Sequence, residues 1–215
     1  MPEDLRPQIP LIRKATIAFN IACEEIEGYE ADDIIATLSV QARDAGGQVT
    51  IISSDKDLMQ LVGNGVVMFD AMKNREIDRD GVFEKFGVYP ESVVDVQALA
   101  GDSVDNVPGA PGIGVKTAAL LINEYGDLNT LLERAGEIKQ PKRRESLINN
   151  VDQIRLSKKL VELDCATPLR FTLDDLEVQD PDPDILLDFL SEMEFRTLTK
   201  RIAIRLGMPE RATED

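Results

Sequence analysis

The sequence contains no histidine, no tryptophan and only two cysteines in 215 residues. Without imidazole the chain cannot carry a Ser-His-Asp triad, a histidine general base or most kinds of zinc site. The two cysteines, Cys23 and Cys165, provide no disulfide framework, so we expect reduced thiols and an intracellular protein. Apolar runs of about 20 residues are missing, as is a charged-then-apolar leader, and we expect neither a membrane span nor secretion.

Basic residues are scarce: the sequence has 24 Lys and Arg and 40 Asp and Glu, which gives a net charge of −16. This acidity argues at first sight against a nucleic-acid partner, because such proteins usually present a basic surface. The acid is concentrated, however: residues 174–194 contain nine acids and no base, and we interpret them as a solvated linker that leads into an acidic helix. Residues 134–159 hold eight bases, which matter only if a nearby motif handles phosphate.

The spacing of apolar residues predicts an α/β half followed by a helical half. A helical pattern at 29–45 precedes a β-branched strand at 49–52, which we expect to be buried on both faces. The alternation then continues into a mostly parallel sheet with right-handed crossovers. Further strands are expected at 65–70, at the edge segment 75–80 and at 21–24, and helices at 11–19, 56–62, 80–86, 90–100, 114–125, 127–135, 142–163, 184–194 and 197–206.

Acidic residues stand at the ends of predicted elements in three short segments. Residues 28–33 begin a helix, residues 53–57 directly follow a strand, and residues 101–106 end an otherwise apolar helix. N-capping explains part of the first two segments, but two acids at a helix C-terminus oppose the helix dipole, and a cation is the simple way to offset them. The candidate metal ligands and catalytic groups are Glu30, Asp32, Asp33, Asp55, Asp57, Asp102 and Asp105.

These acids could not all stay ionised in one place without counter-charge. Oxygen ligands without His or Cys select hard ions such as Mg²⁺, Mn²⁺ or Ca²⁺. Two such ions about 4 Å apart stabilise the attacking and leaving oxygens in phosphodiester cleavage. An EF-hand is excluded, because no segment combines the loop spacing with the terminal Glu.

A turn rich in Gly and Pro, VPGAPGIGVKTA at 107–118, follows the third acidic segment. Its Gly-x-Gly spacing lets backbone N–H groups approach an anion, and the next helix points its N-terminus at the same place. The pattern is typical of a helix-hairpin-helix that holds a DNA backbone without reading bases, whereas the spacing of a Walker A loop is absent. An ordinary turn between helices is the alternative. The candidate DNA-binding residues are Gly112, Ile113, Gly114, Lys116 and Thr117.

In combination, the strings GYEADD (28–33), SSDKDLMQLV (53–62) and GDSVDNVPGAPGIGVKTA (101–118) resemble the 5′-nuclease domain of bacterial DNA polymerase I, in the flap endonuclease superfamily. The resemblance covers nearly the whole chain. It implies a PIN/flap-endonuclease-like sheet and a structure-specific 5′-3′ exonuclease that trims 5′ flaps, nicked DNA and RNA primers in replication and repair. It also implies Mg²⁺ or Mn²⁺ at the seven acids, K⁺ and DNA at the hairpin, and a place in the bacterial cytoplasm at the nucleoid.

The resemblance suggests three parts: the C-terminal part of the nuclease core at 1–80, a helical subdomain with the hairpin at 81–170, and an acidic linker with terminal helices that pack back on the core at 171–215. The family's first strand, two further acids and basic arch have no counterpart in this sequence. We therefore expect a truncated sheet, an exposed apolar flank that favours self-association, weak or no cleavage by this chain alone, and the rest of a polymerase as its partner.

Other functions stay open on the residues alone. The strongest alternative is a non-catalytic module that binds the DNA backbone through the hairpin. A single-strand ribonuclease of the related PIN type shares the acidic α/β site but usually lacks such a hairpin. A phosphohydrolase with an Asp nucleophile matches only partly, at Asp55-Lys56-Asp57.

Overall fold

The structure is a computed structural model that describes residues 2–208. The chain divides into two compact units, Gly28–Pro168 and a smaller one formed by Met1–Glu27 with Leu169–Asp215. Each unit has its own hydrophobic cluster of buried residues. Over residues 2–208 no helix is both long enough and apolar enough to cross a bilayer. The domain boundaries expected at residues 80 and 170 remain predictions.

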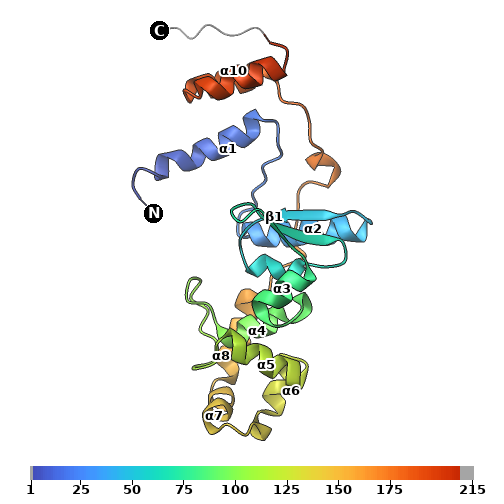
Figure 1. Ribbon diagram of the computed structural model, residues 1–215, viewed down its shortest axis with the longest axis vertical. Helices are drawn as coiled ribbons and strands as arrows, with labels where there is room; N and C mark the ends of the chain where they lie inside the picture. The colour runs from blue at the N-terminus through green and yellow to red at the C-terminus, as the bar shows by residue number, and fades with distance from the viewer. Residues whose placement is uncertain (1, 209–215) are drawn as a thin grey trace. The chain divides into compact units, whose positions relative to one another are not determined.

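The larger unit contains a three-stranded sheet in the order β1-β2-β3. Its strands are β1 (Val49–Ile52), β2 (Val66–Asp70) and β3 (Arg75–Ile77). β1 and β2 pair in parallel, as the alternation of helix and strand predicted, and β3 adds an antiparallel edge (Figure 1). The helix α2 (Ala31–Asp44) precedes β1, and the 3₁₀ helix η2 (Asp57–Leu61) leads from β1 to β2.

Two expectations about the strands are wrong. Strand β1 is buried on one face only, because Ile51 is 5% exposed whereas Ile52 is 71% exposed. The reason is its position: β1 is an edge strand of this sheet and pairs only with β2. Residues 21–24 are irregular rather than a strand, since no neighbouring strand among the described residues offers them a ladder of hydrogen bonds.

Helices make up the rest of the larger unit, and one of them is broken. The helix expected at 142–163 is divided into α7 (Pro141–Asn149) and α8 (Val151–Val161). At the break, the side chain of Asn150 donates to the carbonyl of Ser146 at 2.7 Å, a local bond that competes with the helical backbone. The other helices are α3 (Arg79–Phe86), η3 (Pro90–Ser92), α4 (Val93–Ala100), α5 (Val115–Tyr125), α6 (Leu128–Glu133) and η4 (Ala135–Glu137).

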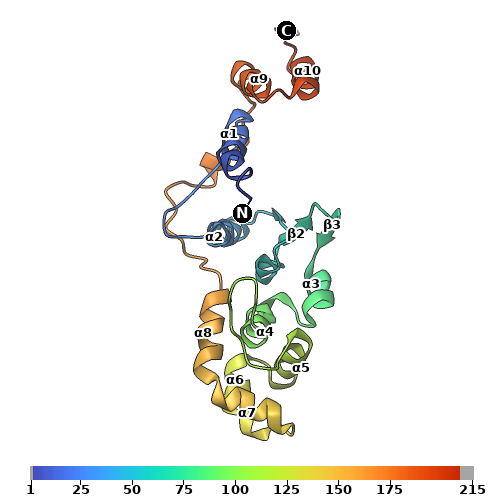
Figure 2. The same cartoon turned by 90° about the vertical axis from the view of Figure 1, so that its left-hand side faces the viewer.

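One core joins the sheet to these helices. Met68 of β2, Leu99 of α4 and Ile122 of α5 all lie in it and are at most 1% exposed. Helix α4 packs against both α5 and α8 (Figure 2). Asp95 of α4 is also buried, and it accepts hydrogen bonds from Lys158 of α8 at 2.8 Å and from the N–H of Leu128 at 3.0 Å. The loops at both ends of α4 and α5 are therefore held by the same packed scaffold.

The smaller unit contains the acidic segment. Asp182 caps a helix by accepting the N–H groups of Asp184 at 2.9 Å and Ile185 at 3.1 Å. Hydrogen bonds from the backbone and hydroxyl of Thr172 hold the pKa of Asp175 below its usual value. Some of the clustered acids thus stabilise local turns and caps. The unit's elements are η1 (Arg6–Gln8), α1 (Ile9–Ala18), η5 (Asp174–Leu176), α9 (Pro183–Glu192) and α10 (Arg196–Arg205).

Candidate metal centre and phosphate-binding hairpin

Three of the predicted acids converge. Asp57 begins η2 after β1, and Asp102 and Asp105 lie in the loop after α4. One carboxylate oxygen of each lies within 4.8 Å of the other two. Asp102 is buried, Asp57 is half-buried and Asp105 is exposed, so the group opens to solvent on one side. Because all three donors are carboxylate oxygens, they fit a hard divalent ion.

The loop with Asp102 and Asp105 is shaped by its own hydrogen bonds. Asp102 and Val107 exchange two backbone bonds, of 2.8 and 2.7 Å. Oδ1 of Asp102 accepts the N–H of Val104 at 2.8 Å. Asn106 adopts a positive φ of 58°, a conformation that asparagine tolerates better than most residues. The loop therefore uses one oxygen of Asp102 for its own shape and leaves Oδ2 for the cluster.

Two side chains that the sequence interpretation did not single out contact the cluster. The ammonium of Lys56 donates to Oδ2 of Asp102 and holds the pKa of that carboxyl below its usual value. The amide of Gln97 donates to Oδ1 of Asp57, whose pKa is nevertheless raised because the carboxyl is partly buried. Lys56 lies between the candidate acids Asp55 and Asp57 in the sequence, and this position could have indicated that its ammonium neutralises them. Gln97 stood among apolar residues of α4, and its polarity there was the only hint.

Gln97 also leaves one polar atom unsatisfied. The residue is 3% exposed, and its carbonyl oxygen Oε1 has no hydrogen-bond partner among the described residues. Buried polar atoms without a partner are uncommon in proteins, and an ordered water or an ion is a common reason for one. Because Gln97 contacts Asp57 through its amide nitrogen, this atom is a second feature consistent with a bound polar group near the cluster.

Asp32 and Asp55 lie beside the group of three. Burial, followed by the charges of Asp55 and then Asp57, raises the pKa of Asp32 to about 6. Asp55 itself stabilises the turn into η2, because its Oδ1 accepts the N–H of Asp57 at 3.0 Å. The region therefore holds more negative charge than the three convergent acids alone.

Asp33 and Glu30 are placed differently. Oδ2 of Asp33 accepts the N–H of Glu30 at 3.3 Å, and its Oδ1 accepts the N–H of Asp164 at 2.9 Å. Asp33 thus closes the N-terminus of α2 and ties it to the chain after α8. Glu30 is the exposed N-cap of the same helix. Neither belongs to the group of three whose oxygens meet.

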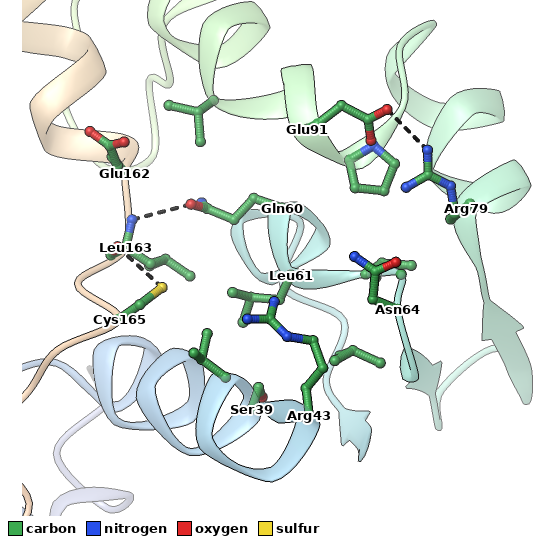
Figure 3. Close-up of a pocket in the computed structure, with 16 residues that line it drawn as sticks. Ser39, Arg43, Gln60, Leu61, Asn64, Arg79, Glu91, Glu162, Leu163 and Cys165 are labelled. Carbon is green, nitrogen blue, oxygen red and sulfur yellow. Dashed lines mark hydrogen bonds and ion pairs between the residues drawn. The ribbon is translucent and has the colours of Figure 1, made fainter. Parts of the chain in front are cut away.

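The segment that carries Asp57 is held by Gln60. Its amide nitrogen donates to the carbonyls of Asp57 and Val161, both at 2.9 Å. Its oxygen accepts the N–H of Leu163 at 3.2 Å, the bond that Figure 3 shows. Gln60 also lines a cavity of about 300 Å³, and the side chain of Arg43 extends from α2 into it (Figure 3). This cavity lies at the start of β2 and none of the seven candidate acids lines it, so it is separate from the carboxylate cluster.

The glycine-rich turn leads into α5 and offers free donors. Gly114 is the N-cap of α5, and the N–H groups of Gly114, Val115 and Lys116 have no acceptor among residues 2–208. Gly112 has a positive φ of 76°, which glycine adopts without strain. Free N–H groups at a helix N-terminus bind anions, and the helix dipole adds to the attraction. Lys116 is exposed at this place.

The other two candidate residues of the hairpin are less accessible. Ile113 is 3% exposed and belongs to the core, so its side chain anchors the turn. Thr117 is half-buried in the first turn of α5. A ligand at the hairpin would therefore meet backbone groups and Lys116 rather than the Ile113 side chain.

Helices α7 and α8 brace the hairpin. The Ser157 hydroxyl accepts the N–H of Gly109 at 3.0 Å, and the Gln153 amide donates to the Gly109 carbonyl at 2.6 Å. The Ser146 hydroxyl donates to the carbonyl of Pro111 at 2.7 Å. Gly109 is packed so closely that a Cβ there would lie 2.4 Å from the backbone nitrogen of Gly101. The acidic loop and the hairpin therefore form one packed structure.

Known protein families match along most of the chain. Residues 1–87 match the N-terminal resolvase-like domain of 5′-3′ exonucleases, and residues 88–184 match their C-terminal SAM fold. A 5′-3′ exonuclease of Aquifex aeolicus is 36% identical over 201 residues, which are 94% of this chain and 68% of that protein. The chain belongs to the 5′-3′ exonuclease family. The family resemblance inferred from the three sequence strings is thereby confirmed.

Longer relatives and a solved structure extend the comparison. A DNA polymerase I of Rhizobium leguminosarum is 58% identical over 202 residues, 94% of this chain, and the chain spans only 20% of that relative's length. A bacteriophage T5 D15 flap endonuclease, solved as a complex with DNA and metal ions, matches with a TM-score of 0.59 at 27% identity, over 65% of this chain and 52% of that one. The expected flap-endonuclease-like α/β fold with a helical second part is confirmed.

Proposed function

We propose that this chain is the metal-dependent 5′-3′ exonuclease and flap endonuclease module of a DNA polymerase I. Its substrates would be DNA with a 5′ flap or nick and RNA primers, in which it hydrolyses phosphodiester bonds. The observation that carries the proposal is the convergence of Asp57, Asp102 and Asp105 within 4.8 Å. Family membership supports it, as do a flap endonuclease neighbour that holds DNA and metal ions and a relative that is a DNA polymerase I.

Asp57, Asp102 and Asp105 would hold Mg²⁺ or Mn²⁺, and the charges of Asp32 and Asp55 beside them would add to the attraction for the ion. Such ions supply positive charge at the phosphate and make a bound water a better nucleophile. The protein's own part is positioning. Gln97 keeps Asp57 in one orientation, and the bond from Val104 does the same for Asp102, so the donors are arranged before any ion or substrate arrives.

The hairpin would hold the phosphate backbone. The N–H groups of Gly114, Val115 and Lys116 are donors without acceptors among the described residues, and they suit a phosphate oxygen. Exposed bases on the bracing helices, such as Lys142 and Arg155, would extend this contact. Since these groups touch phosphate rather than base edges, we expect recognition by shape and a binding constant that falls with salt.

Cleavage of a 5′-labelled flap DNA in Mg²⁺ or Mn²⁺ tests the proposal, with the module measured inside a full-length DNA polymerase I because we expect weak or no cleavage by this chain alone. We expect Asp57→Asn and Asp102→Asn to lower the cleavage rate about a hundredfold or more, because each removes a charged donor from the centre. Asp80→Asn, which changes an exposed acid of α3 outside the cluster, is the matched control and should cleave like the wild type. Equal rates for the wild type and the two cluster variants would overturn the proposal.

The unpaired donors of the hairpin also favour a second candidate, a non-catalytic module that binds the DNA backbone. Fluorescence anisotropy with the same flap DNA separates the two. Salt-sensitive binding in a protein whose cleavage does not depend on Asp57 or Asp102 would favour the binding module. Binding retained in Asp102→Asn together with lost cleavage would favour the nuclease.

A further inference from the structure

Lys56 occupies the place where the cluster needs a cation. It lies between Asp55 and Asp57 in the sequence, yet its ammonium contacts Asp102, which is 46 residues away along the chain. The Lys56 side chain is 34% exposed and that of Asp102 only 5%, so the contact is formed at the inner end of a group that opens to solvent. The hydrogen bond with Asp102 raises the pKa of Lys56, and the charges of Asp57 and Asp105 act in the same direction.

Both carboxylate oxygens of Asp102 already accept a hydrogen bond. Its Oδ1 is engaged by the N–H of Val104 at 2.8 Å, and its Oδ2 is the atom that Lys56 contacts. A divalent ion bound by Asp57, Asp102 and Asp105 would compete with the ammonium of Lys56 for this carboxylate. An ammonium and a divalent ion on one carboxylate would lie only a few ångströms apart, and their repulsion in a partly buried site is worth more than tenfold in affinity.

We propose that Lys56 is a built-in counter-cation of the carboxylate cluster, which a divalent ion must displace from Oδ2 of Asp102 in order to bind. The inference rests on the proposed function, since it assumes that the cluster is a metal centre. Lys56 is then a positioning residue: without an ion it neutralises part of the cluster and keeps Asp102 in its binding orientation. Its four-carbon side chain can swing away without moving the backbone of the site.

The ammonium of Lys56, once displaced, would also affect the binding of the nucleic-acid substrate. Once Lys56 leaves Asp102 it needs another anion, and the phosphate of a strand bound at the centre supplies one. Binding of the ion and binding of the nucleic acid would therefore favour each other through Lys56, by the same factor in both directions.

Isothermal titration of the metal-free chain with Mn²⁺, without nucleic acid, tests the proposal directly. We expect Lys56→Gln to bind Mn²⁺ about tenfold more tightly than the wild type, because no ammonium has to be displaced. Lys56→Arg keeps the charge and should stay close to the wild type. Lys73→Gln is the matched control, since it breaks a similar Lys–Asp pair, Lys73 with Asp70 at 3.1 Å, outside the cluster.

Thermal unfolding gives a second readout that a purely structural role would not produce. In a chelator, Lys56→Gln should unfold at a lower temperature than the wild type, and Mn²⁺ should raise its Tm by more than it raises that of the wild type. Equal Mn²⁺ affinities for the wild type and Lys56→Gln would overturn the inference and leave the proposed function intact. Absence of Mn²⁺ binding in the wild type, Lys56→Gln and Asp102→Asn alike would instead overturn both.

Discussion

Replacing Asp95 with alanine probes how the scaffold beneath the site is held together. Asp95 is 8% exposed and lies in α4, the helix that ends at the acidic loop. One of its oxygens accepts from the ammonium of Lys158 in α8 at 2.8 Å. The other accepts the N–H of Leu128, at the start of α6, at 3.0 Å. One carboxylate therefore joins three helices.

The expected cost follows from these two contacts. Losing the acceptor leaves the N–H of the buried Leu128 unsatisfied, which costs about 1–3 kcal/mol. The ion pair adds about 1 kcal/mol, because the Lys158 side chain is 31% exposed and solvent screens it. We expect Asp95→Ala to lower the free energy of unfolding by about 3 kcal/mol. Asp95→Asn should lower it by about 1 kcal/mol, since its amide oxygen can still accept from Leu128.

Urea denaturation followed by far-ultraviolet circular dichroism measures these differences. Asp44→Asn removes a surface ion pair with Arg43 at 2.8 Å, and as a control it should change the unfolding free energy by less than about 0.5 kcal/mol. The double variant with Lys158→Met should cost less than the sum of its two single changes. The reasoning fails if Asp95→Ala is as stable as the wild type, or if asparagine and alanine cost the same.

Two further predictions concern the hairpin and the first turn of α2. Gly109→Ala should lower the free energy of unfolding by at least about 3 kcal/mol, because its Cβ would lie 2.4 Å from the nitrogen of Gly101. Gly112→Ala, with no atom within 4 Å, should cost only about 1 kcal/mol for its positive φ, and equal losses of Tm in the two variants would contradict the steric argument. In a chelator, the wild type should lose about 1 kcal/mol of stability relative to Asp32→Asn between pH 4 and pH 6, because the pKa of Asp32 is raised from 3.8 to about 6 in the folded state and solvent screens part of the effect. Parallel stability profiles of these two proteins against pH would show that Asp32 is not perturbed.

The fold was predictable where local pattern decides it. The β-branched run Val49–Ile52 is a strand with the bounds that its composition predicted, and the parallel pairing with β2 follows from the short helical segment between them. The exposure of Ile52 was not predictable, because it depends on which strands flank β1. The break at Asn150 was missed because its helical spacing continues on both sides, while a side-chain bond to Ser146 interrupts the backbone.

In the candidate site, too, local sequence pattern predicted some residues and missed those whose role depends on distant contacts. Asp57, Asp102 and Asp105 could be found because each follows the end of a predicted element, where polar side chains gather. The capping bond of Asp33 is local and was predictable, whereas its second bond, from the N–H of Asp164, 131 residues further along the chain, is contained in no local pattern. Gln97 was overlooked because an apolar helix usually indicates core, and only the structure shows its amide beside Asp57.

The net charge of −16 now has a local explanation. Acids such as Asp175 and Asp182 are engaged in turns and caps, and their charge says little about what approaches the metal centre. At salt concentrations near physiological, charges act over about 8 Å, so a ligand responds to the groups nearest to it. At the cluster those groups are the three convergent carboxylates, with Asp32 and Asp55 beside them, and the ammonium of Lys56; their net negative charge would repel a phosphate until a divalent ion binds. At the hairpin they are free N–H groups and Lys116, which attract a phosphate without any ion. On the proposed function, this acidic chain would hold a nucleic-acid backbone at the hairpin, and the approach of that backbone to the carboxylate cluster would depend on the metal.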